Sequence, residues 1–144
     1  MTSLCTSGYF SAMKFTLDAR SGVNLVRGYS PSELRIGERV VVRSCIVTAD
    51  TLITDWQAAA VAQLSIDSLE PLLALDPQIV LVGTGSIARA LPTDIRAVFA
   101  ARQMAFEVMD LGAACRTFNI LVQEERRVAA ALFLEEAAEQ KKAT

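Results

Sequence analysis

Several side chains that can take part in chemistry lie close together in the second half of the chain. A thiol near the start of a helix has a lowered pKa and can act as a nucleophile, and a neighbouring guanidinium can hold an anion. The cluster therefore indicates a thiol-dependent site or an anion-binding surface. Its members are Asp110, Cys115, Arg116, Thr117 and Asn119, all within residues 105–133.

Each of these residues also has a purely structural interpretation. Cys115 lies at helical spacing from Leu111, Phe118 and Val122, so a small buried core residue is expected there. Histidine is absent from the sequence, so no imidazole can act as the partner base of a thiol nucleophile. Arg116 fits a solvated or ion-paired position on the polar side of the helix, and Asn119 fits a role in satisfying backbone groups of a neighbouring loop.

The hydrophobic pattern defines the elements that must position this cluster. Alternation over 105–109 predicts a strand, and Asp110 is suited to cap the helix that follows over 111–123. The continuous apolar run 128–133 predicts a strand that is buried on both faces. We expect 79–82, 105–109 and 128–133 to be neighbouring strands of one sheet with the helix packed on it, and any parallel crossover to be right-handed.

A glycine loop, Gly83-Thr84-Gly85-Ser86, directly follows the predicted strand 79–82. With Ala88 it fits the G-x-G-x-x-A pattern of dinucleotide-binding folds, and Asp110 lies about where a ribose-binding acid would be. Such a loop should continue straight into a helix, whereas Leu91-Pro92 begins a helix separately, so a tight turn at a strand end is the favoured interpretation. Gly83, Thr84, Gly85, Asp110, Cys115, Arg116 and Asn119 form the candidate binding crevice at the carboxyl ends of the strands.

The remaining elements complete an α/β domain. We expect a strand 33–36, a turn at Gly37-Glu38, a strand 39–48 and an extended segment 51–54, with Trp56 as a lid on the core. A strand is expected from Met13, and turns are expected over Gly28–Pro31. A first helix is expected to have Asp67 as its N-cap and Glu70 as its third residue, and to end at Asp76-Pro77. A second helix is expected to have Pro92 at its first position. The predicted fold has three layers, with helices flanking a mixed central sheet and an N-terminal hairpin region. A single domain over 13–134 lies between a loose tail 1–12 and a charged tail 135–144.

Composition narrows the possible functions. The 144 residues carry 14 basic and 16 acidic side chains, for a formal net charge of −2, so no electrostatic footprint for nucleic acid is present. The absence of histidine excludes histidine-dependent catalytic triads and most zinc sites. Three scattered cysteines, Cys5, Cys45 and Cys115, are typical of a reducing compartment, and no signal peptide or membrane span is recognisable. A cytoplasmic location is expected.

The chain resembles a family of small domains of unknown function. The resemblance rests on Gly83-Thr84-Gly85, on Leu91-Pro92, and on ACRTFN at 114–119, and it extends over roughly residues 14–134. The family includes mitochondrial complex I assembly factor 3 and an adipogenesis-associated protein, together with bacterial and archaeal members. The resemblance implies a three-layer fold with a mixed sheet, an assembly or scaffolding role, and no established catalysis.

Two classes of function follow from these observations. The resemblance favours a non-catalytic assembly or protein-interaction module, linked to membrane-protein or respiratory-complex assembly. The alternative is a small-molecule-binding protein or thiol-dependent enzyme that uses the strand-end crevice. A hydrolase with paired carboxylates is a weaker third interpretation, because Glu107 and Asp110 have no clear partner acid. We expect the chain to bind a protein partner, and we expect it to bind no cofactor, metal or nucleic acid. The sequence is compatible with a homo-oligomer.

Overall fold

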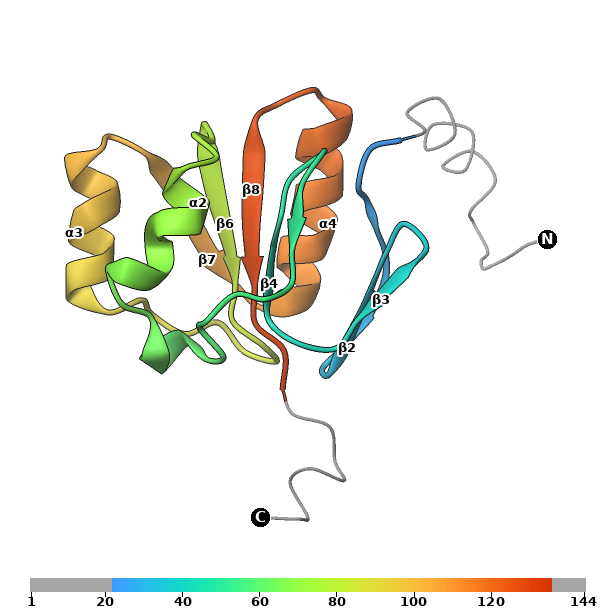
Figure 1. The fold of residues 1–144 in the computed structure, drawn as a ribbon, viewed down its shortest axis with the longest axis horizontal. Coiled ribbons are helices and arrows are strands. Elements are labelled where there is room, and N and C mark those ends of the chain that lie inside the picture. The colour runs from blue at the N-terminus through green and yellow to red at the C-terminus, as the bar shows by residue number, and fades with distance from the viewer. Residues whose placement is uncertain (1–21, 136–144) are drawn as a thin grey trace, which may run out of the picture.

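The computed structural model describes residues 22–135, in which a five-stranded mixed sheet forms the centre (Figure 1). Its strand order is β5-β4-β8-β6-β7. β6 runs parallel to both β7 and β8, whereas β4 is antiparallel to β8 and to β5. The sheet therefore joins a parallel half to an antiparallel half. Its strands are β4 (Cys45–Val47), β5 (Leu52–Ile53), β6 (Ile79–Gly83), β7 (Ala105–Met109) and β8 (Val128–Leu132).

Helices cover both faces of this sheet, as Figure 1 shows. On one face α2 (Glu70–Leu73) and α3 (Thr93–Ala101) enclose a core cluster with Trp56 and Phe99. On the other face α4 (Leu111–Gln123) packs on β6 and β8, and its buried side chains include Cys115 and Phe118. The predicted three-layer fold with a mixed sheet is confirmed, as are the neighbouring strands β6, β7 and β8 with α4 packed on them.

A second sheet of three antiparallel strands lies beyond α4. Its strands are β1 (Val26–Ser30), β2 (Glu33–Ile36) and β3 (Arg39–Val41). Leu34, Ile36 and Val41 turn their side chains into the same core cluster as the inner face of α4. The small sheet is therefore a flanking layer that holds α4 against the central sheet.

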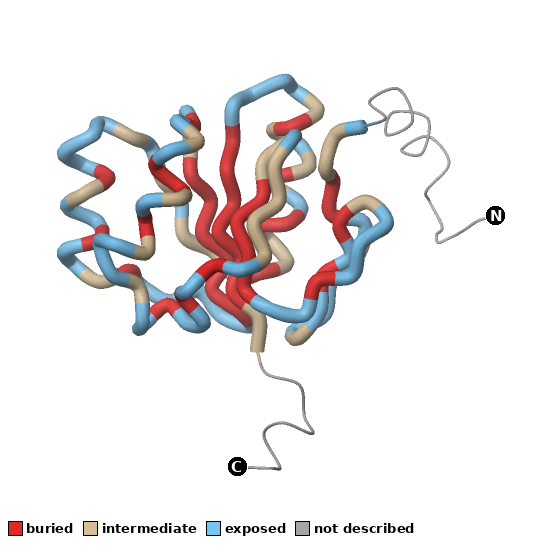
Figure 2. Tube along the Cα trace, viewed as in Figure 1, coloured by how far each residue is buried: buried red, intermediate tan, exposed pale blue. Residues whose placement is uncertain are grey.

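The middle strand of the central sheet is built from small side chains. β8 has the sequence VAAAL, and all five residues are buried (Figure 2). Ala129 and Ala130 are both 0% exposed, one in each of the two core clusters. The prediction of a strand buried on both faces at 128–133 is confirmed, since alternate side chains of a strand point to opposite faces.

Two predictions about the N-terminal strands were wrong. The expected strand 39–48 is divided, because β3 pairs with β2 in the small sheet while β4 pairs with β8 in the central sheet. Gly28–Pro31 is not simply a turn, because Gly28 to Ser30 belong to β1, which pairs with β2. The turn at Gly37, with φ +60°, is where predicted. The strand expected from Met13 and both predicted tails lie outside the described residues, except Glu135.

The helix starts also differ in detail from prediction. Asp67 and Glu70 form no capping box. Instead Ser65 and Ser68 cap each other's backbone, with the N–H of Ser65 donating to Oγ of Ser68 at 2.9 Å and the N–H of Ser68 donating to Oγ of Ser65 at 3.1 Å. Serine is favoured at a helix N-terminus because its short side chain places the hydroxyl within hydrogen-bond distance of backbone N–H groups that have no partner in the first turn. Pro92 is the N-cap of α3 and not its first residue, and Asp76 ends the α2 region with φ 52°.

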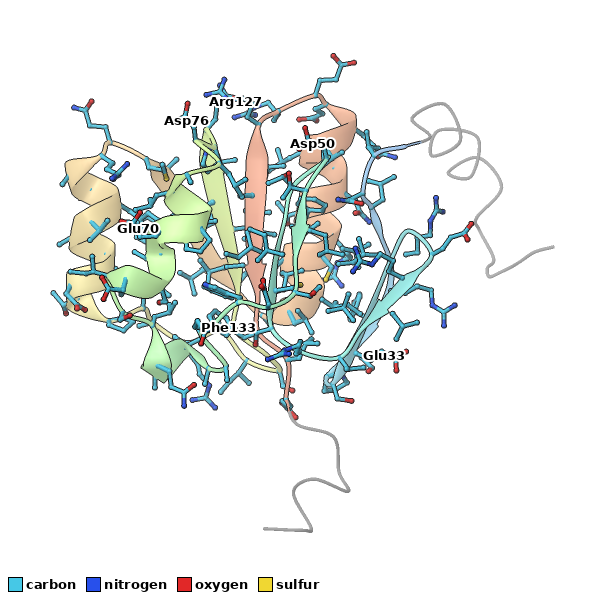
Figure 3. The ribbon with its side chains drawn as sticks, viewed as in Figure 1. Glu33, Asp50, Glu70, Asp76, Arg127 and Phe133 are labelled. Atoms are coloured by element: carbon cyan, nitrogen blue, oxygen red, sulfur yellow. The ribbon has the colours of Figure 1, made fainter. Side chains whose placement is uncertain are left out.

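Trp56 is a core residue, as expected. It is 5% exposed, and its indole N–H donates to the carbonyl of Ser68 at 2.8 Å. The centroid of its ring lies 5.1 Å from the ring centroid of Phe133, which directly follows β8 at the lower end of the strand in Figure 3. Among residues 22–135, no helix has the length and apolar character that a membrane crossing requires.

Candidate functional site

A crevice of about 470 Å³ lies where β6 and β7 end and α4 begins. Three segments distant in sequence form its walls, namely the end of β1 and its turn, the glycine loop, and the first turns of α4. The crevice is at the carboxyl ends of parallel strands, where α/β sheets usually place ligands. Its lining residues are Tyr29, Ser30, Pro31, Gly85, Ser86, Asp110, Leu111, Gly112 and Arg116.

The glycine loop is closed by its own hydrogen bonds. Thr84 is 5% exposed, and its hydroxyl donates to the carbonyl of Ile87 at 2.7 Å and accepts from the N–H of Arg89 at 2.9 Å. Gly85 has φ +93°, a conformation that glycine adopts without strain. Its carbonyl accepts from the N–H of Leu111 at 2.7 Å, so the loop is attached to the first residue of α4. Thr84 is thus a structural residue, while Gly85 borders the crevice.

Gly83 is required by close packing and does not reach the crevice. A Cβ at this position would lie 2.9 Å from Cβ of Ala114, 3.1 Å from Cδ2 of Leu132 and 3.3 Å from Cα of Leu111. The glycine allows the end of β6 to contact the first turns of α4 directly. The G-x-G-x-x-A pattern therefore serves helix–strand packing here, and the next helix, α3, begins only at Thr93.

Asp110 is the N-cap of α4, as predicted. Its Oδ1 accepts a hydrogen bond from the N–H of Ala113 at 2.9 Å. A carboxylate at this position is stabilised by the partial positive charge of the helix start. One oxygen of the carboxylate is therefore used for capping, while the residue also lines the crevice.

Arg116 is held over the crevice by Tyr29. Its Nη1 donates to the Tyr29 hydroxyl at 2.6 Å, and both side chains are exposed, Tyr29 to 46%. The tyrosine ring covers Gly112, where a Cβ would lie 2.7 Å from the hydroxyl oxygen and 2.9 Å from ring carbons. A guanidinium has five N–H donors, so this hydrogen bond leaves others directed to solvent. Arg116 therefore connects α4 to β1.

Cys115 lies in the core and does not open into the crevice. It is 1% exposed, and burial raises the pKa of its thiol from 9.0 to about 12, with Asp110 adding to the rise and Arg116 opposing it. Cys45 is in the same cluster, and burial raises the pKa of its thiol to about 12 as well. The predicted burial of Cys115 is confirmed. A protonated, enclosed thiol is a poor nucleophile.

Asn119 is also occupied within the protein. Its Oδ1 accepts from the N–H of Val26 at 2.8 Å, and its Nδ2 donates to the carbonyl of Val26 at 2.8 Å. The side chain therefore pairs with the backbone of β1, which is a strand and not the loop that was expected. Of the predicted site residues, the structure brings Gly85, Asp110 and Arg116 together at the crevice, while Gly83, Thr84, Cys115 and Asn119 lie behind or beside it.

Sequence reasoning missed the wall that β1 contributes. The sequence Gly28–Pro31 is typical of a turn, although Val26 and Tyr29 favour a strand that could pair with β2 across Pro31-Ser32. Ser86 of the glycine loop also lines the crevice, and its hydroxyl donates to Oε2 of Glu135 at 2.6 Å.

A second groove, of about 610 Å³, lies on the other side of the glycine loop. Its lining includes Gln63, Ile87, Arg89, Phe133 and Glu135, with alanines from 59–62. The opposite end of the sheet carries Asp76 and Arg127, away from both grooves (Figure 3). Within residues 22–135, no three acidic or cysteine side chains are grouped closely enough to hold a metal ion.

A family model described as "Protein of unknown function (DUF498/DUF598)" matches residues 26–133. The chain is also 32% identical over 114 residues to a Danio rerio protein named NADH dehydrogenase (ubiquinone) 1 alpha subcomplex assembly factor 3. That match covers 78% of this chain and 65% of the zebrafish protein, so the chain spans less than two thirds of that relative's length.

Solved structures share the same architecture. A Xanthomonas campestris protein superposes with a TM-score of 0.73 at 30% identity, over 80% of this chain and 87% of that one. A Bordetella pertussis protein described as an Mth938-like domain has a TM-score of 0.71 at 22% identity, over 84% of this chain and 92% of that one. The second likeness concerns the fold alone.

Proposed function

The chain belongs to the DUF498/DUF598 family of unknown function, and we propose from this membership that it is a non-catalytic assembly module that binds a protein partner at the crevice. One observation carries the proposal. The exposed guanidinium of Arg116 is fixed over an open hollow by Tyr29, so a charged anchor is presented at the surface while the thiol of Cys115 is buried beneath it. Fixed arginine–tyrosine surfaces are typical of protein contacts, where both residue types are enriched.

The names of relatives support an assembly role in general. The zebrafish relative is named as an assembly factor of NADH dehydrogenase, a respiratory enzyme. For the present chain we propose a related role in the assembly of a membrane or respiratory complex. The partner would offer an acidic side chain to Arg116, since a guanidinium pairs best with a carboxylate.

The chemistry of the candidate residues favours binding over thiol catalysis. The thiol of Cys115 is enclosed and has a raised pKa, and an oxygen of Asp110 is engaged in capping α4. The alternative of a thiol-dependent enzyme would require Cys115 to reach the crevice, and the observed packing does not provide this. A cytoplasmic location remains part of the proposal, supported by the two free buried cysteines, Cys45 and Cys115.

Charge reversal at Arg116 tests the proposal. We expect Arg116→Glu to lower recovery of partners from a lysate of the native cell by about tenfold, the factor that corresponds to ~1.4 kcal/mol. The glutamate can still accept a hydrogen bond from the Tyr29 hydroxyl, so the melting temperature should stay within about 3 °C of the wild type. Crosslinking followed by mass spectrometry measures the recovery, and circular dichroism the melting.

Two control variants separate charge from fold. Arg116→Lys keeps the positive charge and should retain most of the recovery, and Arg96→Glu reverses an exposed charge on α3, away from the crevice, and should have no effect. Full recovery with Arg116→Glu at unchanged melting would show that the crevice is not the binding surface. A large fall in melting temperature would assign Arg116 a structural role.

A further inference from the structure

Charge is distributed unevenly over the described chain. Residues 22–43, which contain the small sheet, carry four arginines and two glutamates, for a formal charge of +2. Residues 44–135 carry six arginines and eleven acidic side chains, for a formal charge of −5. The small sheet lies on the opposite side of the molecule from α2 and α3 (Figure 1). One side is therefore basic in an acidic chain, an asymmetry typical of proteins that bind nucleic acid or a membrane surface.

The basic side chains of this segment are free to bind an external anion. Within residues 22–135, none of the four guanidiniums forms a hydrogen bond or an ion pair with another side chain or with the backbone. Glu33 begins β2 and Glu38 follows its end, and neither pairs with an arginine. Each guanidinium therefore has its N–H donors directed to solvent. The four residues are exposed, and they are Arg27, Arg35, Arg39 and Arg43.

Two valines at the outer strand of the same sheet are also exposed. Val40 in β3 is 54% exposed, and Val42, which directly follows the strand, is 67% exposed. Val41 between them is buried in the core cluster under α4, so the exposed valines lie on the side of the strand away from the core. Their methyl groups gain nothing from the fold and are accessible to an apolar phase outside the molecule.

The register of the small sheet places arginines around these valines. Arg35 of β2 is directly opposite Val40, and residues that are opposite each other share one face of a sheet. Gly28 of β1 is opposite Arg35 on its other side, and without a side chain it leaves a hollow of about 190 Å³ there. Arg39 and Arg43 precede and follow the valine run in the sequence RVVVR. Exposed apolar groups are therefore bounded by cationic ones.

This combination favours a lipid surface over nucleic acid. Guanidiniums contact the phosphates of both, but nucleic-acid sites add aromatic rings that stack on bases or polar groups that read base edges. The exposed aromatic residue of the segment, Tyr29, is instead hydrogen-bonded to Arg116 of α4. Exposed valines have no role on a hydrated polyanion, whereas apolar side chains bounded by basic ones are typical of proteins that lie on an anionic membrane.

We propose that the outer face of the small sheet binds the surface of an anionic lipid bilayer. Val40 and Val42 enter the boundary between headgroups and acyl chains, while Arg35, Arg39 and Arg43 contact the lipid phosphates. The side of the molecule with α2 and α3 then faces away from the bilayer, and this orientation separates the acidic remainder of the chain from the anionic lipids. The inference does not depend on the proposed partner contact at Arg116.

Co-sedimentation of the full chain with lipid vesicles tests the proposal. The wild type should sediment with vesicles of equimolar phosphatidylglycerol and phosphatidylcholine, and it should stay in the supernatant with pure phosphatidylcholine. Raising the salt concentration from about 0.1 M to about 1 M shortens the screening length from about 10 Å to about 3 Å, and should reduce the partition coefficient by about fivefold or more.

Two double variants separate the charges from the apolar contact. Arg39→Glu with Arg43→Glu should lower the partition coefficient by about 25-fold or more, because each arginine near an anionic surface contributes about fivefold. Val40→Thr with Val42→Thr keeps the shape of both side chains and should lower it several-fold, because a hydroxyl group is costly to transfer into the acyl region. All four positions are exposed, so melting temperatures measured by circular dichroism should stay within about 3 °C of the wild type.

Matched substitutions on the opposite side of the molecule are the controls. Arg96→Glu on α3 and Ile66→Thr near the start of α2 change exposed residues of the same types and should leave the partition coefficient unchanged. A wild type that does not sediment with the anionic vesicles would overturn the proposal. Binding that the glutamate variant weakens and the threonine variant leaves intact would equally overturn it, because the face would then suit a hydrated polyanion such as nucleic acid.

Discussion

The buried thiols are the residues whose chemistry the fold changes most. Cys45 and Cys115 belong to one core cluster, and burial raises the pKa of each from 9.0 to about 12. We expect neither thiol to react rapidly with a thiol reagent in the native state, and Cys115→Ala to lower stability by about 1 kcal/mol at pH 8 without abolishing partner binding. Labelling and urea denaturation check these expectations, and fast native-state labelling of Cys115 would restore the enzyme hypothesis.

The same thiols should make stability depend on alkaline pH. In the unfolded chain a thiol loses its proton above about pH 9, whereas the folded thiol keeps it until about pH 12. The unfolded state then binds fewer protons, so the free energy of unfolding falls as pH rises, by up to ~1.4 kcal/mol per pH unit for each thiol. In Cys115→Ala the free energy of unfolding should fall less steeply with pH, so that it equals that of the wild type near pH 10. Equal slopes for both proteins in urea titrations between pH 8 and 10.5 would contradict the assignment.

At the scale of elements, the contact between β6 and α4 depends on the absence of a side chain at Gly83. Gly83→Ala places a methyl group 2.9 Å from Cβ of Ala114 and 3.3 Å from Cα of Leu111, and neither atom belongs to a flexible side chain. We expect the substitution to reduce the free energy of unfolding by about 1–3 kcal/mol, the usual cost of overpacking. Urea denaturation measures it.

A matched glycine and a second-site change make that measurement specific. Gly28→Ala adds the same methyl group in β1, where no atom lies within 4 Å, and should change stability by less than about 0.5 kcal/mol. In a double-mutant cycle, Ala114→Gly should recover part of the loss caused by Gly83→Ala, although glycine itself weakens the helix. Strict additivity would show that the two positions are not in steric conflict.

At the scale of the whole molecule, the small sheet should open more easily than the central sheet. Asn119 attaches α4 to β1 through two hydrogen bonds of 2.8 Å to Val26. Losing them should cost about 1–3 kcal/mol, so in Asn119→Ala the amides of β1 and β2 should exchange about tenfold faster or more. Hydrogen-exchange mass spectrometry should find β6 and β8 unchanged, and Thr117→Ala serves as a control on the same helix. A uniform increase across both sheets would mean that they unfold as one unit.

The sequence predicted the parts of the fold whose signals are local. The helical period of 111–123, the capping by Asp110, and the continuous apolar run at 128–133 are each contained in a short window, and each is confirmed. The division of 39–48 between two sheets could not be predicted. Val40 and Val42 are 54% and 67% exposed while Val41 is buried, but all three continue one valine-rich run.

The crevice was only partly predictable for a similar reason. The glycine loop and Asp110 both follow strands, so their meeting at one end of the sheet follows from topology. Tyr29 lies 87 positions from Arg116, and their hydrogen bond depends on how the small sheet packs on α4. No periodicity within one segment carries that information, and the same holds for the pairing of Asn119 with Val26.

The alanine-rich strand β8 has a consequence for how this protein can vary. Mutation of a buried leucine to a smaller residue leaves a cavity. An alanine has only a methyl group to remove, and this is the case at Ala129, Ala130 and Ala131. Sequence change at the centre of the sheet is therefore one-sided, since nearly every substitution adds volume and separates the layers on either side. A saturation mutagenesis profile should show these three alanine positions tolerating glycine or serine better than valine or leucine, the reverse of the usual preference of a buried strand.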